Sequence, residues 1–281
     1  MQDRDFGWAI PMMQAGYAGR GLVYLAVAGI SLYTIWQGGE AQGTSAALAQ
    51  LEQSAWGTAA LIAIGIGLLA YMLWRVVCGL YDLEDEGTGA KAAIARTGQI
   101  VTGLIHGALG FAVFAIMLSA ASSGGGSKIA EFTGQVMSLP AGIWIVGIAG
   151  AITVGAGLYY LKKAYKEEYR EKLEANHFTR NWNLALKAGV AAQGVTVTII
   201  GVFLVVAALQ ADPSQAGGLD RAFSWLSGQI YGQILVTILC VGLAGFSLFC
   251  FVNAAYRIVP KAAGDDIQSL ASKAKAHAQS A

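Results

Sequence analysis

The chain contains an internal repeat, and this repeat constrains the fold more than any other feature of the sequence. A Gly-x4-Gly pair occurs at residues 16–21, 98–103 and 189–194. A Gly-x3-aromatic-x9-Tyr pattern follows each pair about fifty residues later, at residues 67–81, 155–169 and 242–256. Two landmarks that recur in one order are typical of a protein built from repeated supersecondary units. The sequence therefore predicts three similar units.

The composition places these units in a membrane. Hydrophobic residues make up 56% of the chain and charged residues 12%, about half of the roughly 25% found in a typical soluble domain. Long apolar runs end at charged stretches, as in helices that cross a hydrocarbon core about 30 Å thick. The predicted spans are residues 19–37, 57–80, 99–119, 141–161, 187–209 and 232–256. We expect an all-α, polytopic membrane protein with six transmembrane helices.

Consecutive spans pair into three similar hairpins. The predicted hairpin repeats occupy residues 12–86, 96–170 and 185–260, and a cytoplasmic tail follows at 261–281. The N-terminus lacks the basic segment and cleavage site of a signal peptide, so we expect the first span to remain in the mature chain. Three hairpins that share one orientation would be related by pseudo-three-fold symmetry about an axis along the membrane normal.

The orientation follows from the distribution of Lys and Arg. The N-terminus, the 81–98 and 162–187 loops and the tail, counted with the adjoining span ends, hold sixteen of the eighteen Lys and Arg residues. The other three loops hold only Lys128 and Arg221. Because loops rich in Lys and Arg remain in the cytoplasm, we expect both termini to be cytoplasmic.

The loops on the opposite side carry a second, weaker pattern. Leu48 and Leu51 in the first loop match Phe223 and Leu226 in the third, and an aromatic residue precedes the glycine that opens the next span. This pattern favours a short amphipathic helix on the membrane surface, although an ordinary surface turn is also compatible with it. The second loop instead contains a Gly/Ser insertion at 122–127, which is typical of a flexible segment.

The segments at residues 14–32 and 67–82, QAGYAGRGLVYLAVAGISL and GLLAYMLWRVVCGLYD, resemble a bacterial membrane family, domain of unknown function 1206 (DUF-1206). The unit of that family is a two-helix hairpin that is usually present three times. The resemblance extends from about Gln14 to Val259 and implies a multi-pass location in the bacterial inner (plasma) membrane. It implies no activity, cofactor or catalytic residue. The second and third units replace Arg20 with Thr102 and Gln193.

Four polar residues within or beside the spans are candidates for a pathway or for lipid contact. Arg20 lies at the predicted cytoplasmic mouth of the first span, and Arg75 lies near the end of the second. Both favour snorkelling or phospholipid contact, and an anion-binding or intramembrane pairing role is the alternative. His106 is suited to a hydrogen bond between helices or to proton transfer. Asn253 is polar and lies near a span end.

Charged segments beside the spans predict a solvated surface. We expect the acidic run at 82–86 to face the cytoplasm. We also expect the fourth span to continue as a cytoplasmic helix, with Glu168 and Lys172 as an i,i+4 pair. Docking to a protein partner or to anionic lipid headgroups at this face is the alternative.

The absence of known catalytic motifs favours a non-enzymatic structural or interaction component. The sequence lacks Walker A, HExxH, GxSxG and GxGxxG motifs, and we expect no catalytic residue, metal or cofactor. The predicted partners are membrane lipids and a protein at the cytoplasmic face, without nucleic acid, and the oligomeric state stays open. The alternative function is a small-solute or ion pathway, as in a channel or transporter, along the pseudo-three-fold axis.

Overall fold

The computed structural model describes residues 7–118 and 128–260. Within these residues all helices are joined by loops, and the extended structure is limited to one isolated antiparallel bridge. Six helices are long and apolar enough to cross a membrane. They are α1 (Ala9–Trp36), α3 (Gly57–Tyr81), α4 (Ala90–Leu118), α6 (Gly142–Tyr165), α8 (Asn183–Gln210) and α10 (Gly232–Tyr256). The predicted all-α, polytopic membrane fold is confirmed.

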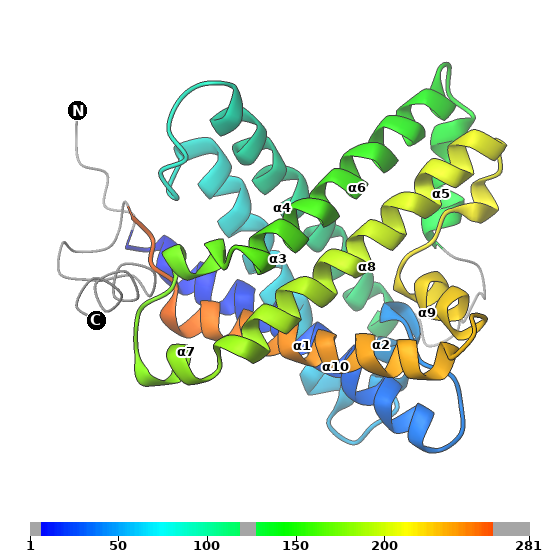
Figure 1. The fold of residues 1–281 in the computed structure, drawn as a ribbon, viewed down its shortest axis with the longest axis horizontal. Coiled ribbons are helices and arrows are strands. Elements are labelled where there is room, and N and C mark those ends of the chain that lie inside the picture. The colour runs from blue at the N-terminus through cyan, green and yellow to red at the C-terminus, as the bar shows by residue number, and fades with distance from the viewer. Residues whose placement is uncertain (1–6, 119–127, 261–281) are drawn as a thin grey trace.

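Shorter helices lie at both ends of the bundle (Figure 1). At one end, on the right of Figure 1, are α2 (Thr44–Glu52), α5 (Lys128–Met137), η2 (Pro213–Gln215) and α9 (Leu219–Ser227). At the other end are η1 (Glu168–Lys172) and α7 (His177–Asn181). We call this second end, with the α3–α4 loop and the residues after α10, the basic end. The predicted short helices in the first and third loops are confirmed as α2 and α9. The 122–127 insertion and the 261–281 tail lie outside the described residues.

Some helix ends differ from the predicted spans. α1 begins at Ala9 rather than near residue 19, and α4 begins at Ala90 rather than near residue 99. The first turns of α1 bury Met13 but contain Pro11 and Gly16, whose low helix propensity weakens the sequence signal for a helix there. α6 ends earlier than expected, because Glu167 takes a left-handed backbone conformation with φ 55° before η1 begins. The prediction that the fourth span continues as one helix is therefore wrong.

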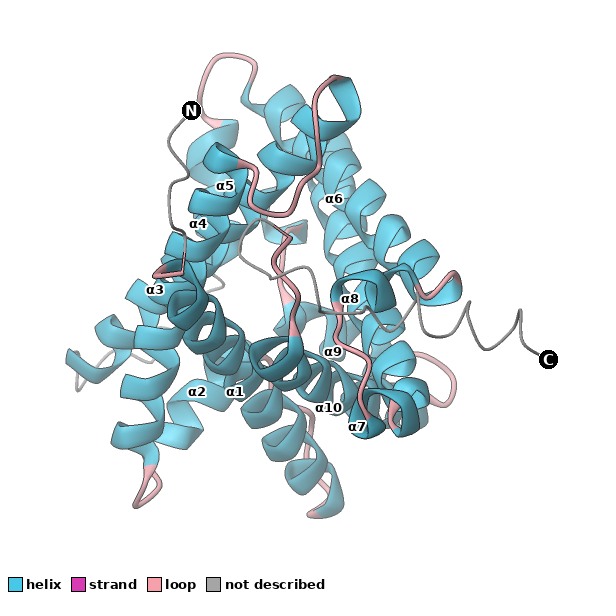
Figure 2. Cartoon of the chain, turned by 90° about the vertical axis from the view of Figure 1, so that its left-hand side faces the viewer, coloured by secondary structure: helices cyan, strands magenta, loops and turns pink. Residues whose placement is uncertain are grey.

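The long helices pack in the order α4–α3–α1–α10–α8–α6. Figure 2 shows α1 and α10 between the α3/α4 pair on one side and the α6/α8 pair on the other. A closed ring of three hairpins would make these five contacts and a sixth one, between α4 and α6. In the parts of the chain that the structure describes, α4 packs on α3 and α6 packs on α8, and the two helices of the second hairpin lie apart.

The first glycine of each Gly-x4-Gly pair shows why two hairpins are closed and one is open. A Cβ at Gly16 would lie 2.6 Å from the Cα of Tyr71 on α3, and a Cβ at Gly189 would overlap the backbone of Gly245 on α10. Small residues let membrane helices approach this closely. The equivalent Gly98 on α4 would place its Cβ in open space. The second hairpin has the glycine for a close contact but does not make the contact.

The second glycine of each pair faces the neighbouring hairpin. It meets α10 at Gly21, α3 at Gly103 and α6 at Gly194. All three contacts between hairpins are therefore present, whereas one contact within a hairpin is absent from the described residues. The three-hairpin layout fits the structure as an open ring, and the expected pseudo-three-fold symmetry is not confirmed.

An apolar core fills the bundle toward α2 and α9. It combines side chains from five of the long helices with side chains from the two short ones. Buried members include Val27, Leu68, Val113, Phe203, Leu243, Leu48 and Phe223. Within a bilayer, close packing rather than exclusion of water holds such a core together. The buried ionic side chains gather toward the basic end instead.

Candidate functional site

The loop after α3 turns sharply and directs Glu84 beneath the bundle. α3 ends at Tyr81, and Asp82 takes a left-handed backbone conformation with φ 54°. The Asp82 carboxylate accepts hydrogen bonds from the backbone N–H groups of Glu86 and Gly87, at 2.8 and 3.2 Å. Side chains that bond the backbone in this way stabilise turns. The turn holds Glu84 on its inner side, where the residue is only 6% exposed.

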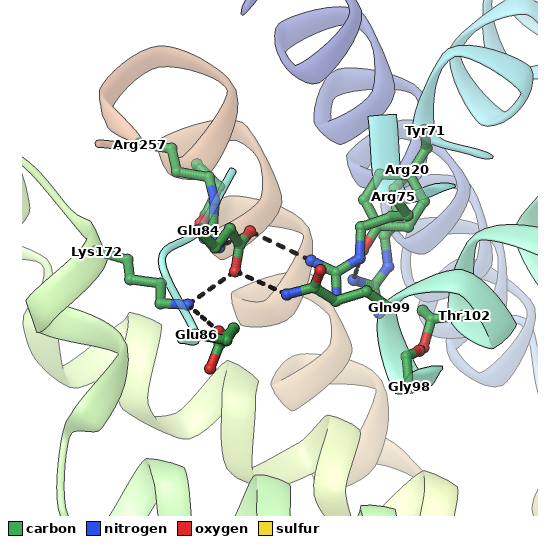
Figure 3. A network of polar contacts seen from close by, with 11 residues as sticks. Arg20, Tyr71, Arg75, Glu84, Glu86, Gly98, Gln99, Thr102, Lys172 and Arg257 are labelled. Carbon is green, nitrogen blue, oxygen red and sulfur yellow. Dashed lines mark hydrogen bonds and ion pairs between the residues drawn. The ribbon is translucent and has the colours of Figure 1, made fainter. Parts of the chain in front are cut away.

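Four donors from all three repeats converge on the Glu84 carboxylate (Figure 3). Oε1 accepts from Arg75 Nη1 at 3.3 Å and from Arg257 Nη2 at 2.6 Å. Oε2 accepts from Lys172 Nζ at 2.8 Å and from Gln99 Nε2 at 3.4 Å. We call Glu84 and these four partners the ionic knot. The knot joins the basic ends of the three repeats.

A short backbone pairing positions two of these donors. The carbonyl oxygen of Lys172 accepts from the N–H of Ile258 at 3.0 Å, and the N–H of Glu174 donates to the carbonyl oxygen of Tyr256 at 2.9 Å. The segments after α6 and α10 therefore run antiparallel and side by side. This pairing brings the Lys and Arg donors of the second and third repeats to the same carboxylate.

The surrounding charges decide the ionisation of Glu84. Burial by itself raises the pKa of this carboxyl group, because the low-dielectric interior disfavours the charged form. The charges of Arg257, Arg75 and Lys172 outweigh burial and hold the pKa well below its ordinary value of 4.5. Glu84 is therefore ionised at neutral pH, and it compensates several buried cations at once.

Asn253 orients one member of the knot. Its Oδ1 accepts from Arg257 Nη1 at 2.6 Å, and its Nδ2 donates to the carbonyl oxygen of Phe249 at 2.8 Å. The guanidinium of Arg257 also lies 5.2 Å from the ring centroid of Tyr17 on α1. Asn253 is 1% exposed, and both ends of its amide are engaged. Its position indicates a structural role.

Arg20 is a buried cation for which the described residues provide no carboxylate partner. Its Nη1 donates to the hydroxyl of Tyr71 at 3.0 Å, and its guanidinium lies 4.9 Å from the ring centroid of Phe246. Its Nε is buried without a hydrogen-bond partner. Among the described residues, no Asp or Glu lies within ion-pair distance of it. Because α1 begins at Ala9, Arg20 lies roughly 16 Å along the helix and is 4% exposed, rather than at a mouth from which it could snorkel.

His106 lies on the other side of Tyr71. The two ring centroids are 4.9 Å apart. The Nδ1 of His106 is 2.8 Å from the carbonyl oxygen of Thr102. A carbonyl oxygen can only accept a hydrogen bond, so this contact assigns the proton to Nδ1 and leaves Nε2 directed away from its own helix. His106 therefore combines a fixed ring with an Nε2 for which the described residues provide no hydrogen bond.

The structure brings the four predicted site residues into one connected polar cluster. Arg75 and Asn253 take part at the ionic knot, while Arg20 and His106 both contact Tyr71. Tyr17 links the two parts, because its ring packs edge-on against Tyr71 at 5.3 Å and lies beneath Arg257. The cluster extends from the basic end into the membrane-spanning part of the bundle.

Sequence reasoning missed the centre of this cluster. The prediction that the acidic run at 82–86 is solvated is wrong for Glu84, and Lys172 pairs with Glu84 rather than Glu168. The internal repeat contains a signal that could have identified the Glu84–Lys172 pair. Glu84, Lys172 and Val259 each stand three residues after the last tyrosine of a unit. Equivalent positions of repeats arranged around one centre converge, and an opposite-charge pair at such positions favours a direct contact.

Two pockets lie outside this cluster. One, of about 170 Å³, is lined by Phe178, Leu248, Phe251, Val252 and Tyr256. The other, of about 280 Å³, is lined by Ile35, Gln233, Ile234, Thr237 and Ile238. Neither includes a residue of the ionic knot, Arg20 or His106. No group of three or more His, Cys, Asp or Glu side chains in residues 7–118 and 128–260 is placed to hold a metal ion.

Comparison with known proteins supports the repeat and leaves the activity open. An uncharacterised protein of Bacillus subtilis (strain 168), YxxB, is 24% identical over 254 residues, which cover 89% of this chain and 92% of the relative. No solved structure matches. The model of a domain of unknown function, DUF1206, matches residues 15–82, 97–167 and 188–257. These three matches coincide with the repeats and cover most of the sequence, so the chain belongs to the DUF1206 family.

Proposed function

We propose that this protein is a non-enzymatic structural component of the bacterial inner membrane that binds a membrane lipid between α4 and α6. Both termini and the basic end would face the cytoplasm, as the distribution of Lys and Arg predicts. The observation that carries the proposal is the separation of α4 from α6 within a ring whose five other contacts are made.

The burial of the six long helices supports this assignment. In α4 and α6, 22% of the most apolar stretch is buried, against 39% in α1 and 44% in α3, α8 and α10. The facing glycines of the second hairpin, Gly98 and Gly155, would each place a Cβ in open space. Their equivalents in the other hairpins contact a partner helix. Among residues 7–118 and 128–260, a packing surface is therefore left without a partner at one place in the ring, and we propose that lipid occupies it.

The polar side chains support a non-enzymatic role. The buried carboxylate, Glu84, is occupied by four structural donors. The three cysteines, Cys78, Cys240 and Cys250, are buried and unpaired and are suited to packing. A protein partner at the cytoplasmic face stays a prediction of the charge pattern.

Photo-crosslinking in native membranes tests lipid binding at this surface. We would place a diazirine amino acid at Ile152, which is 68% exposed on the side of α6 away from Gly150 and α8. The matched control is Leu158, which is 54% exposed and lies elsewhere around the same helix. We expect a defined lipid adduct at position 152 and an unselective mixture of bulk lipids at position 158. The same mixture at both positions would contradict the proposal.

A solute or ion pathway is the second candidate, and buried Arg20 beside His106 is the observation that favours it. The apolar core described above opposes it, because side chains of five long helices pack together inside the bundle. In a liposome flux assay we expect no transport of common ions or small solutes above empty vesicles. Flux that is reduced in both His106→Ala and Arg75→Ala would replace the lipid-binding proposal.

A further inference from the structure

The pocket of about 170 Å³ is an apolar groove between α7 and α10 at the basic end. Its lining combines one residue of α7 with four residues on the last turns of α10: Phe178, then Leu248, Phe251, Val252 and Tyr256. Figures 1 and 2 both show α7 beside this end of α10. Pockets for small-molecule ligands usually enclose about 300–1,000 Å³. The size of the groove therefore suits one or two side chains better than a cofactor or a substrate.

Hydrogen bonds hold the α7 wall of the groove in place. The Oδ1 of Asn176 accepts from the N–H of Thr179 at 2.9 Å, and the Thr179 hydroxyl accepts from the N–H of Asn176 at 3.1 Å. The same hydroxyl donates to the carbonyl oxygen of Glu174 at 2.8 Å, and Thr179 is buried. The ring of Phe178 stacks on Trp182, with the centroids 5.8 Å apart, and stays 37% exposed. The groove is therefore a preformed surface with an accessible apolar wall.

We propose that this groove binds the C-terminal tail of the same chain, residues 261–281, through Ile267 and Leu270. These two are the large apolar side chains of a tail that otherwise consists of small and polar residues. They stand three residues apart, the spacing with which one face of a helical segment enters an apolar groove. The inference goes beyond the proposed function, because it concerns a surface other than the α4–α6 opening and does not depend on lipid binding there.

The described part of the chain starts the tail within reach of the groove. Tyr256 lines the groove, and Pro260, the last described residue, stands four residues further on. Val259 is 4% exposed and packs in the cluster that contains Met13 of α1, so the tail starts from a fixed point. Ile267 follows Pro260 by seven residues, which span up to roughly 25 Å when extended. The α10 side of the groove extends over roughly 12 Å, so the tail is long enough to reach it.

The tether favours the tail over a free partner. A segment joined to the protein by a short linker is present at an effective concentration on the order of millimolar. The contact therefore requires only the modest gain from burying two apolar side chains. Charged residues flank the apolar pair on both sides, at Asp265 and Asp266 and at Lys273 and Lys275. This pattern suits a segment that lies at the membrane surface, where apolar side chains point inward and charges face water.

Photo-crosslinking of the full-length protein in native membranes tests the inference. A diazirine analogue of leucine replaces Leu270, and peptide mass spectrometry locates the adduct. We expect an intramolecular adduct on the α7 or α10 peptides that line the groove. The matched control places the same probe at Ser280, in the same tail but away from the apolar pair, and should give no preferred site. Lipid adducts alone at position 270, an adduct on another surface, or an adduct on a second copy of the chain would overturn the tail as the occupant.

Substitutions on both sides of the contact show whether the groove selects the tail. Phe178→Ala removes the α7 wall and should lower the yield of the adduct several-fold, whereas Phe178→Leu, which keeps an apolar side chain, should retain most of it. Leu184→Ala is the matched control, because Leu184 is 79% exposed near the start of α8, and should leave the yield unchanged. If Phe178→Ala does not fold, Ile267→Asp decides, since it leaves the groove intact and should lower the yield as well. Equal yields in Ile267→Asp and wild type would contradict the inference.

Discussion

Replacement of Glu84 by glutamine is expected to lower the free energy of unfolding by about 3–5 kcal/mol, the cost of removing one partner from a buried ion pair. The estimate applies here because the Glu84 side chain is 4% exposed and the Arg257 side chain is 6% exposed. Removal of the carboxylate leaves Arg75 and Arg257 without the carboxylate that they share, and it leaves Lys172 with Glu86 alone among the ion pairs of the described residues.

Glutamine cannot restore the lost interactions through its amide. Each carboxylate oxygen of Glu84 accepts from two donors. The amide offers one oxygen and one NH2 group, so either orientation places a donor against two donors. The effect should therefore exceed that of a simple loss of charge.

Thermal unfolding in mild detergent measures this difference. A thiol-reactive dye reports unfolding through the three buried cysteines. The control is Glu86→Gln, since within residues 7–118 and 128–260 Glu86 forms one ion pair, with Lys172, and its side chain is 27% exposed. We expect that control to cost less than about 1 kcal/mol. Equal melting temperatures for Glu84→Gln and wild type would show that the ionic knot does not hold the repeats together.

The loss of folding stability at acid pH should also depend on Glu84. The folded-state pKa of Glu84 lies well below the ordinary value of 4.5, so the unfolded chain binds the proton first as pH falls. The stabilisation is complete above about pH 5 and is lost as pH falls below 4.5 toward the folded-state pKa. Circular dichroism melts from pH 7 to pH 3 should show wild type approaching Glu84→Gln at low pH. A constant difference would contradict this assignment.

The repeat predicts the helices better than it predicts their arrangement. Length, hydropathy and the paired landmarks identify all six spans, because these features depend on the chain within each unit. The start of α1 is missed because Pro11 and Gly16 weaken its helix signal. The start of α4 is missed because Lys91 and Arg96 interrupt its apolar run. The separation of α4 from α6 has no local signal: Gly98 stands at the same place in its unit as Gly16 and Gly189. Whether a given glycine packs against a partner helix depends on contacts between repeats, and the sequence within one unit does not show these contacts.

The sequence predicts the residues around Glu84 in the candidate site but does not predict Glu84 itself. Arg20, Arg75, His106 and Asn253 are polar residues in apolar surroundings, which a single sequence reveals. Glu84 lies in a run of acidic residues, where a solvated position is the ordinary expectation. Its role depends on Lys172 and Arg257, which are 88 and 173 residues away in the sequence. Only the folded ring brings these residues together.

The open second hairpin predicts opposite effects for two equivalent glycine substitutions. In Gly189→Ala, the new Cβ would overlap the backbone of Gly245 on α10. A backbone obstacle cannot rotate away, so α8 and α10 must separate. We expect a loss of about 3 kcal/mol, the upper part of the usual range for overpacking.

In Gly98→Ala, the new Cβ would enter open space on an exposed turn of α4. Alanine is favoured over glycine within a helix by about 1 kcal/mol, so this variant should be as stable as wild type or more so. Both variants would be melted in the same detergent with the dye assay described above. A loss in Gly98→Ala comparable to that in Gly189→Ala would mean that α4 and α6 pack together in the folded protein. That result would close the ring and remove the lipid site with it, because the acyl chain and the α4–α6 contact require the same surface.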